Sequence, residues 1–173
     1  MSLGSNIEPE KNLRAAVELL SERLTVIRRS RIFATRAVAA LPMPDFLNAA
    51  VEVETDRTAG DLKFGVLRDI EGQLGRRRTS DKNAPRVIDL DIALYGAEVI
   101  ESEALGLLIP DPEILTRLHV VVPLADIAPD RVHPLNGTAL EEIARVLNEE
   151  SPDKALRPAR NSDLLREWST RDD

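Results

Sequence analysis

Hydrophobic and polar positions along the chain follow two periods, one typical of helices and one typical of strands. Extended segments are predicted at residues 1–4, 25–35, 46–55 and 87–95. Between them, apolar residues recur every three or four positions, as on one helix face. These positions are Leu13, Ala16, Val17, Leu20 and Leu24 in the first helix, and Leu62, Val66, Ile70 and Leu74 in the second. The order β-α-β-β-α-β predicts an α+β protein with a ferredoxin-like antiparallel sheet and two helices on one of its faces.

The second predicted helix has clear start and stop signals. Thr58 precedes Asp61 at the spacing of a reciprocal cap, and Gly75 follows the last apolar position. We therefore expect this helix to end just before a group of arginines and to lead directly into the last strand.

The rest of the chain is expected to add to this unit rather than to form a second domain. Its predicted elements are a short strand at 98–100, a short helix from 110 to about 116, an apolar segment at 119–127 broken by Pro123, and an amphipathic segment at 138–148. We predict a single domain over residues 1–150 with C-terminal additions to the sheet. Residues 151–173 are polar and charged, which predicts a frayed or loosely docked extension.

The last strand of the predicted sheet carries two carboxylates on one face. Asp89 and Asp91 are two positions apart, so in a strand their side chains point to the same side, roughly 6.6 Å apart along the strand. The opposite face is apolar, with Ile88, Leu90, Ile92 and Leu94. Mg²⁺ is commonly held by one or two carboxylates together with phosphate oxygens, and two such ions can clamp a phosphoryl group. The pattern favours a metal site, and a solvated Asp pair on an edge strand is the alternative.

A basic cluster precedes this strand and consists of Arg76, Arg77, Arg78, Lys82 and Arg86. The formal net charge of the chain is −7, so this cluster is a local exception that can attract a polyphosphate. Metal-binding carboxylates beside phosphate-binding arginines are typical of phosphoryl transfer. Under the alternative, the arginines only balance the two aspartates.

Composition narrows the class of protein further. The chain has 173 residues, of which 43% are hydrophobic and 31% charged, as is ordinary for one soluble domain. The chain contains no cysteine, which excludes disulfides and thiolate metal sites and suits the cytoplasm. The negative charge argues against nucleic acid as a partner, and no apolar run has the length of a membrane span. We expect a cytoplasmic monomer, with a dimer as the alternative.

Four motifs in order resemble those of the 6-hydroxymethyl-7,8-dihydropterin pyrophosphokinase family over about residues 1–137. The motifs are Leu3-Gly4-Ser5-Asn6, then Thr35 with Phe46-Leu47-Asn48-Ala49, then Glu71 with Gly75-Arg76-x-Arg78 and Pro85-Arg86-x-Ile88-Asp89-Leu90-Asp91-Ile92, and finally Ile109-Pro110, Arg117 and Pro123-Leu124. The resemblance implies that ATP, as co-substrate, gives its β,γ-pyrophosphate to the hydroxymethyl group of a reduced pterin and leaves as AMP. It also implies the ferredoxin-like fold that the order of elements predicts independently.

The resemblance implies a role for each matching residue. The catalytic residues would be Arg76, Arg86, Asp89 and Asp91, and the last two would hold two Mg²⁺ ions. ATP would be bound by Glu71, Arg76, Arg78, Arg86, Ile92, Asp111 and Arg117. The pterin would be bound by Thr35, Val38, Phe46, Asn48, Asp89 and His119. Alternatives from the residue types alone are an exposed helical position for Glu71, a strand-surface position for Asn48, a core position for Phe46 and a hydrogen-bonded, half-buried position for His119.

Several positions depart from the pattern of the family. Asp111 stands where the family usually has His, His119 where an aromatic residue stacks on the pterin, and Asn83 where some members have Trp. The family also has more apolar residues before the first motif, so we expect a shortened first strand. These departures leave open a non-catalytic module that binds nucleotide or pterin. A different two-metal phosphotransferase or nuclease is a further alternative, although it does not explain Asn48 or the first motif.

Overall fold

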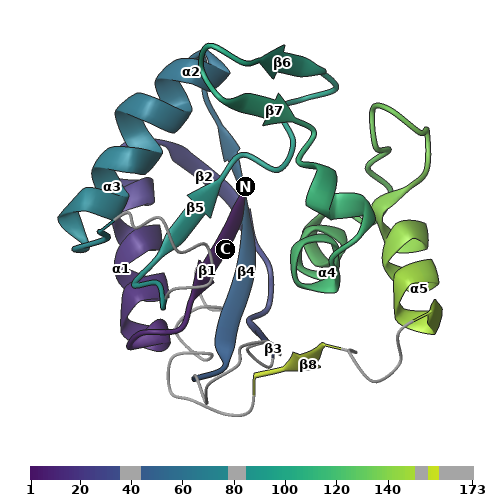
Figure 1. Cartoon of the computed structure of the whole chain (residues 1–173), viewed down its shortest axis with the longest axis horizontal. Helices are drawn as coiled ribbons and strands as arrows, with labels where there is room; N and C mark the ends of the chain where they lie inside the picture. Colours follow the sequence, from purple (N-terminus) through teal and green to yellow (C-terminus); the bar gives the residue numbers. More distant parts are fainter. Residues whose placement is uncertain (36–43, 78–84, 151–155, 160–173) are drawn as a thin grey trace.

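The computed structural model describes residues 1–35, 44–77, 85–150 and 156–159, and its largest element is an antiparallel sheet (Figure 1). The strands of this sheet are β1 (Ser2–Ser5), β2 (Thr25–Arg29), β3 (Phe33–Thr35), β4 (Phe46–Glu54), β5 (Asp89–Asp91) and β8 (Arg157–Pro158). Their order is β5-β1-β4-β3-β8, and β2 also pairs with β4. All these pairs are antiparallel.

Helices cover both faces of the sheet (Figure 1). On one face lie α1 (Pro9–Ser21) and a continuous helical segment made of α2 (Ala59–Asp61), the π-helix η1 (Leu62–Leu67) and α3 (Arg68–Gln73). On the other face lie α4 (Leu118–Ile127) and, outside it, α5 (Leu140–Glu150). A mixed α/β protein with an antiparallel sheet and helices packed against it is therefore confirmed. The sequence predicted helices on one face only.

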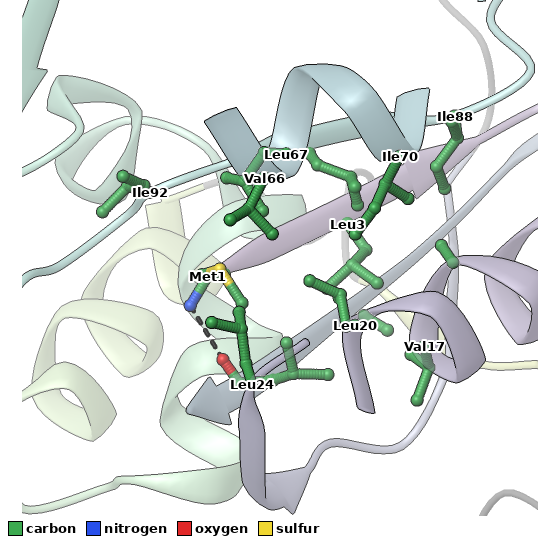
Figure 2. Packing of buried hydrophobic residues seen from close by; sticks show 14 of the residues in the cluster. Met1, Leu3, Val17, Leu20, Leu24, Val66, Leu67, Ile70, Ile88 and Ile92 are labelled. Carbon is green, nitrogen blue, oxygen red and sulfur yellow. Dashed lines mark hydrogen bonds between the residues drawn. The ribbon is translucent and has the colours of Figure 1, made fainter. Parts of the chain in front are cut away.

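The first hydrophobic core lies between the sheet and α1 with α3 (Figure 2). Leu3 of β1, Leu20 of α1 and Ile70 of α3 meet there, and each is almost fully buried. Ile88, Leu90 and Ile92 join the same core, as the alternation of the last strand predicts. Leu94, which lies three residues beyond the end of β5 at Asp91, packs in the second core instead.

The second core lies between the sheet and α4, and it explains why α4 is a helix. The sequence pattern predicts an apolar segment broken at Pro123, but the structure has an uninterrupted helix that contains this proline. Val121 and Leu124 are buried there against Ala50 of β4. Burial of this face outweighs the helix-breaking tendency of one proline, because tertiary packing commonly overrides propensity.

Two predicted strands are divided or shortened. Residues 25–35 form two strands because this segment contains a β-bulge. Arg29 pairs with Val51 and Phe33 pairs with Asn48, so the segment advances by four residues where β4 advances by three. Ser30 fills the gap, since its hydroxyl accepts a hydrogen bond from Ala50 N at 2.8 Å. The strand predicted at 87–95 is reduced to β5.

Some elements have no counterpart in the sequence-based prediction. The hairpin of β6 (Ile100–Ser102) and β7 (Leu107–Ile109) forms a separate two-stranded sheet, of which only a short first strand was expected. Strand β8 pairs with β3, and Ala159 N donates to Ile32 O at 2.9 Å.

The short helix predicted from 110 is the 3-10 helix η2 (Pro112–Leu115). The single domain over 1–150 stays a prediction.

The cap predicted at Thr58 is present in a modified form. The hydroxyl oxygen of Thr58 accepts from Asp61 N at 3.1 Å, and the hydroxyl donates to the Asp61 carboxylate at 2.7 Å. The second bond of a reciprocal cap, from the backbone N–H of Thr58, is replaced by this side-chain contact.

In the part of the chain that the structure describes, no helix combines the length and the apolar character needed to span a membrane.

Candidate active site

Asp89 and Asp91 lie on the same face of β5, as predicted. Antiparallel pairing places Asp89 opposite Gly4 of β1, and Gly4 opposite Asn48 of β4. Directly paired residues share a face of the sheet. Asp89, Gly4 and Asn48 therefore form one row across three strands, and Leu90 faces the opposite side, in the first core.

Asp89 is neutralised by two arginines. One carboxylate oxygen contacts the Arg76 guanidinium, and the other accepts from Arg86 Nη1 at 2.6 Å. The side chain of Asp89 is 22% exposed and that of Arg76 is 13% exposed, so the interaction is partly shielded from water. Hydrogen bonding and charge from Asp89 and Glu71 hold the pKa of Arg76 above its ordinary value, although burial acts in the opposite direction. Arg76 therefore remains a cation in the site.

Glu71 is a buried residue that holds other residues of the site in position. It is only 3% exposed, so the alternative of an exposed helical glutamate is wrong. Its Oε1 contacts the Arg76 guanidinium and accepts from Leu90 N at 2.9 Å. Glu71 thus ties α3, Arg76 and the middle of β5 together. Its contact with ATP stays a prediction.

The first motif of the chain fixes the segment that leads into β5. Arg86 N donates to Asn6 Oδ1 at 2.7 Å, and Asn6 N donates to Arg86 O at 3.1 Å. The Ser5 hydroxyl donates to Val87 O at 2.5 Å. Both Ser5 and Asn6 are buried, and Asn6 Nδ2 has no hydrogen-bond partner among the described residues. The motif thereby sets the position from which Arg86 reaches Asp89.

Asp91 is paired with a lysine that the sequence analysis did not identify. Lys63 of η1 places its ammonium group against Asp91 Oδ1. The sequence does contain an indication of this pairing. Lys63 lies three residues before Val66 and seven before Ile70, so it is a charged residue on the helix face that is otherwise apolar. A charged residue at such a position is expected to have a partner in the protein.

Asn48 and Thr35 form the other end of the row. Asn48 is 5% exposed, so it is not a strand-surface residue, and its Nδ2 donates to Thr35 Oγ1 at 2.9 Å. Gly4 leaves the surface between Asn48 and Asp89 without a side chain: a Cβ atom at Gly4 would lie 3.4 Å from Asn48 Oδ1. Phe46 is half-buried at the start of β4 and pairs with Thr35.

Asp111 and His119 lie around η2 and the start of α4. Asp111 Oδ1 accepts from Glu113 N at 2.9 Å and so caps η2, and burial raises the pKa of its carboxyl. His119 is half-buried and its Nε2 lies 3.7 Å from Glu113 Oε2. Burial lowers the pKa of His119, so the imidazole is neutral at pH 7. Arg117 is exposed immediately before α4.

Other predicted residues lie elsewhere or outside the described chain. Ile92 is buried in the first core, on the side opposite Asp91, so its contact with ATP stays a prediction. Val38, Arg78 and Asn83 lie outside the described residues.

The donor set fits a divalent cation that also has phosphate ligands. Asp89 and Asp91 offer hard oxygen donors on one face of β5. Within the described ranges there is no group of three or more His, Cys, Asp or Glu that could hold a metal ion by itself. A metal held by this pair can take further ligands from water or from a bound phosphate.

Comparison with known proteins identifies the family of the chain. Residues 1–129 match the family described as 7,8-dihydro-6-hydroxymethylpterin-pyrophosphokinase. The chain belongs to this family. The pyrophosphokinase family match thus covers every element from β1 to α4, including both aspartates and the motif around Asn6.

Relatives of the pyrophosphokinase family include both short and long proteins. The 2-amino-4-hydroxy-6-hydroxymethyldihydropteridine pyrophosphokinase of Bacillus subtilis is 41% identical over 130 residues, which are 73% of this chain and 75% of that protein. The protein of the same name from Haemophilus influenzae is 33% identical over 148 residues, 84% of this chain and 89% of that protein. The folic acid synthesis protein fol1 of Pneumocystis carinii is 39% identical over 142 residues, 81% of this chain but only 19% of that protein. The chain therefore spans about a fifth of this longer relative.

Proposed function

We propose that the chain transfers the β,γ-pyrophosphate of ATP to the hydroxymethyl group of 6-hydroxymethyl-7,8-dihydropterin and releases AMP, as a step of folate synthesis. Membership of the family supports pyrophosphate transfer to this pterin, as do the names of the Bacillus and Haemophilus relatives. The structural observation that carries the proposal is the row of Asp89, Gly4 and Asn48 across three strands. At one end of this row is a carboxylate with the arginines that would bind phosphate. At the other end is an amide that can form hydrogen bonds with the edge of a pterin.

Asp89 and Asp91 are the residues that would hold Mg²⁺, as two ions. When bound, Mg²⁺ neutralises phosphate charge and orients the reacting oxygens. The supporting observation is the pair of hard oxygen donors on one face of β5, to which ATP can add phosphate oxygens.

Arg76 and Arg86 would bind the triphosphate and stabilise the transition state. Both guanidinium groups lie at Asp89, and each is anchored by the protein, Arg76 by Glu71 and Arg86 by the backbone contacts with Asn6. In the reaction, the hydroxymethyl oxygen forms a bond to the β-phosphorus and releases its proton to solvent, while the bond from that phosphorus to the bridging oxygen of AMP breaks and its electron pair leaves with AMP. Negative charge that develops on the phosphate oxygens and on AMP is stabilised by these fixed cations.

The pterin would lie over Gly4, with Asn48 at its polar edge. An amide side chain both donates and accepts, and Thr35 fixes the orientation of this amide. The hydroxymethyl group then points along the row toward Asp89. Phe46 and His119 would line the ring, and the neutral imidazole of His119 suits stacking better than a charged one.

The proposal includes the ferredoxin-like topology. If β2 and β3 are counted as one bulged strand, the order across the sheet is β5, β1, β4 and then this strand. This is the arrangement expected of a βαββαβ unit with an antiparallel sheet, and the strand order supports it. The monomeric state and the cytoplasmic location stay predictions.

The experiment is a coupled assay for AMP with ATP, Mg²⁺ and the reduced pterin alcohol. We expect AMP formation that Asp89→Asn and Asp91→Asn each reduce by at least about 100-fold, while the exposed Asp56→Asn leaves it unchanged. Arg86→Ala should lower turnover far more than pterin affinity. Retained turnover in either aspartate variant would refute the metal assignment. Binding of an ATP analogue by the wild-type chain without AMP formation would instead indicate a non-catalytic binding module.

A further inference from the structure

Lys63 is the cation that neutralises Asp91. Its side chain is 23% exposed and that of Asp91 is 39% exposed. The neighbouring residues Leu62 and Val66 are buried in the first core, so the backbone that carries Lys63 is held firmly against the sheet. A partly buried pair on a fixed backbone loses less energy to solvent and to side-chain disorder than a surface pair does.

The helix geometry at Lys63 is unusual. The backbone N–H of Arg68 donates to Lys63 O, five residues back, as in a π-helix. Such turns are uncommon, occur mostly inside α-helices and are frequent at functional sites. Here the π-helix η1 begins next to Lys63, the residue of this helical segment that contacts Asp91.

Within the described part of the chain, both aspartates of β5 are neutralised by protein cations. Asp89 contacts Arg76 and Arg86, and Asp91 contacts Lys63. A divalent cation at Asp91 competes with the ammonium group for the charge of this carboxylate, because two cations held that close repel each other.

We propose that Lys63 competes with a divalent cation for Asp91 and thereby keeps the metal affinity of the nucleotide-free protein low. This inference rests on the proposed function, since it takes Asp91 as a metal ligand. When a nucleotide arrives, its phosphate oxygens add ligands that favour the metal over Lys63. Lys63 therefore makes metal binding depend on the nucleotide.

Asp111 is a further acidic residue near the pair of Lys63 and Asp91. Its carboxyl lies within electrostatic reach of both Asp91 and Lys63. One of its oxygens already caps η2, which fixes the side chain in place. The negative charge of Asp111 therefore also acts on the Lys63 ammonium group. This assigns a role to an aspartate at a position where the resembling family usually has His.

The test measures Mn²⁺ binding without nucleotide, by electron paramagnetic resonance, because it needs no turnover. We compare wild type, Lys63→Met, Lys63→Arg and the control Lys11→Met, whose lysine pairs with Glu8 on the surface. Lys63→Met should bind Mn²⁺ about fivefold more tightly or better, which corresponds to about 1 kcal/mol. Lys63→Arg and Lys11→Met should bind like wild type. Adding Asp91→Asn to Lys63→Met should remove the gain.

Equal Mn²⁺ affinity of wild type and Lys63→Met would overturn the inference, and so would a gain that persists with Asp91→Asn. Failure of every variant to bind Mn²⁺ would overturn it as well. The AMP assay on the wild type separates this result from failure of the proposed function. A chain that forms AMP while Lys63→Met binds Mn²⁺ unchanged keeps the function and loses the role of Lys63.

Discussion

Asn6 and Arg86, which are 80 residues apart, exchange two hydrogen bonds in opposite directions. Arg86 N donates to the Asn6 side chain at 2.7 Å, and Asn6 N donates to Arg86 O at 3.1 Å. This pair links the end of β1 to the residue that contacts Asp89, three positions further on. The first motif therefore fixes the backbone of Arg86, the arginine that the proposal assigns to the triphosphate.

Asn6→Ala should impair both stability and turnover. The substitution leaves Arg86 N without its acceptor, at a cost of about 1–3 kcal/mol, and it frees the segment that positions the guanidinium group. Urea unfolding and AMP formation measure the two effects. Asn12→Ala is the matched control, because Asn12 is also buried and donates to Ile7 O but does not contact Arg86. If both variants lose turnover equally, Asn6 has no special role in placing Arg86.

Glu71→Gln should destabilise the chain by about 2 kcal/mol, because it removes one of the two carboxylates that compensate the largely buried charge of Arg76. Its remaining oxygen can still accept from Leu90 N, so the loss reports the negative charge of Glu71. Denaturant unfolding measures it. Asp69→Asn serves as control, since Asp69 is an exposed acid of the same helix that pairs with Arg23. The control should change stability by at most about 1 kcal/mol. Equal losses in the two variants would contradict the buried role of Glu71.

Gly4→Val should weaken pterin binding by about tenfold or more and leave ATP binding nearly unchanged. A branched side chain suits a strand but fills the space between Asn48 and Asp89 that the proposal assigns to the ring. Titration of the protein with the pterin alcohol measures the effect. Gly65→Ala is the control, because a Cβ atom there meets nothing within 4 Å. Unchanged pterin affinity in Gly4→Val would place the ring elsewhere.

The stability of the chain that starts at Met1 should rise between pH 6 and pH 8. The Met1 ammonium group is buried and donates to Val51 O at 2.8 Å, as the dashed line in Figure 2 shows. Burial lowers its pKa from 8.0 to about 6, although the charge of Glu52 acts against this. In this pH range the unfolded chain binds the proton and the folded chain does not, so stability increases with pH, by up to about 3 kcal/mol.

Urea unfolding at pH 6, 7 and 8 tests this pH dependence. N-terminal acetylation is the control, because it keeps an N–H donor at Met1 and removes the charge. The acetylated chain should show a smaller rise in stability, which reflects the half-buried His119 and the buried His133, whose pKa values burial also lowers. Identical pH profiles for the two forms would contradict the assignment to Met1.

Much of the fold follows from local periodicity, and the carboxylate pair is the clearest case. Period two places Asp89 and Asp91 together and Leu90 on the core side, and the structure bears this out. Periodicity does not reveal which carboxylates the protein itself neutralises. Burial of Glu71 and the pairing of Lys63 depend on how the second helix lies against β5, which is a property of tertiary packing.

The elements that sequence reasoning missed depend on long-range contacts. Helix α4 contains Pro123 and is held by burial against β4, and β8 exists because it pairs with β3 from the far end of the chain. The local sequence of α4 contains a proline and that of β8 has polar neighbours, so the local pattern predicts neither element. The motif around Asn6 is the opposite case, because the resemblance singled it out and the structure supplies its contacts with Arg86 and Val87.

The most direct test of the account is the metal dependence of nucleotide binding. Isothermal titration calorimetry with a non-hydrolysable ATP analogue compares wild type and Asp89→Asn/Asp91→Asn, each with and without Mg²⁺. The account predicts that Mg²⁺ strengthens binding to wild type by at least about tenfold and has little effect on the double variant. An equal gain from Mg²⁺ in both proteins would show that these two aspartates do not hold the metal, and the account of the site would be wrong.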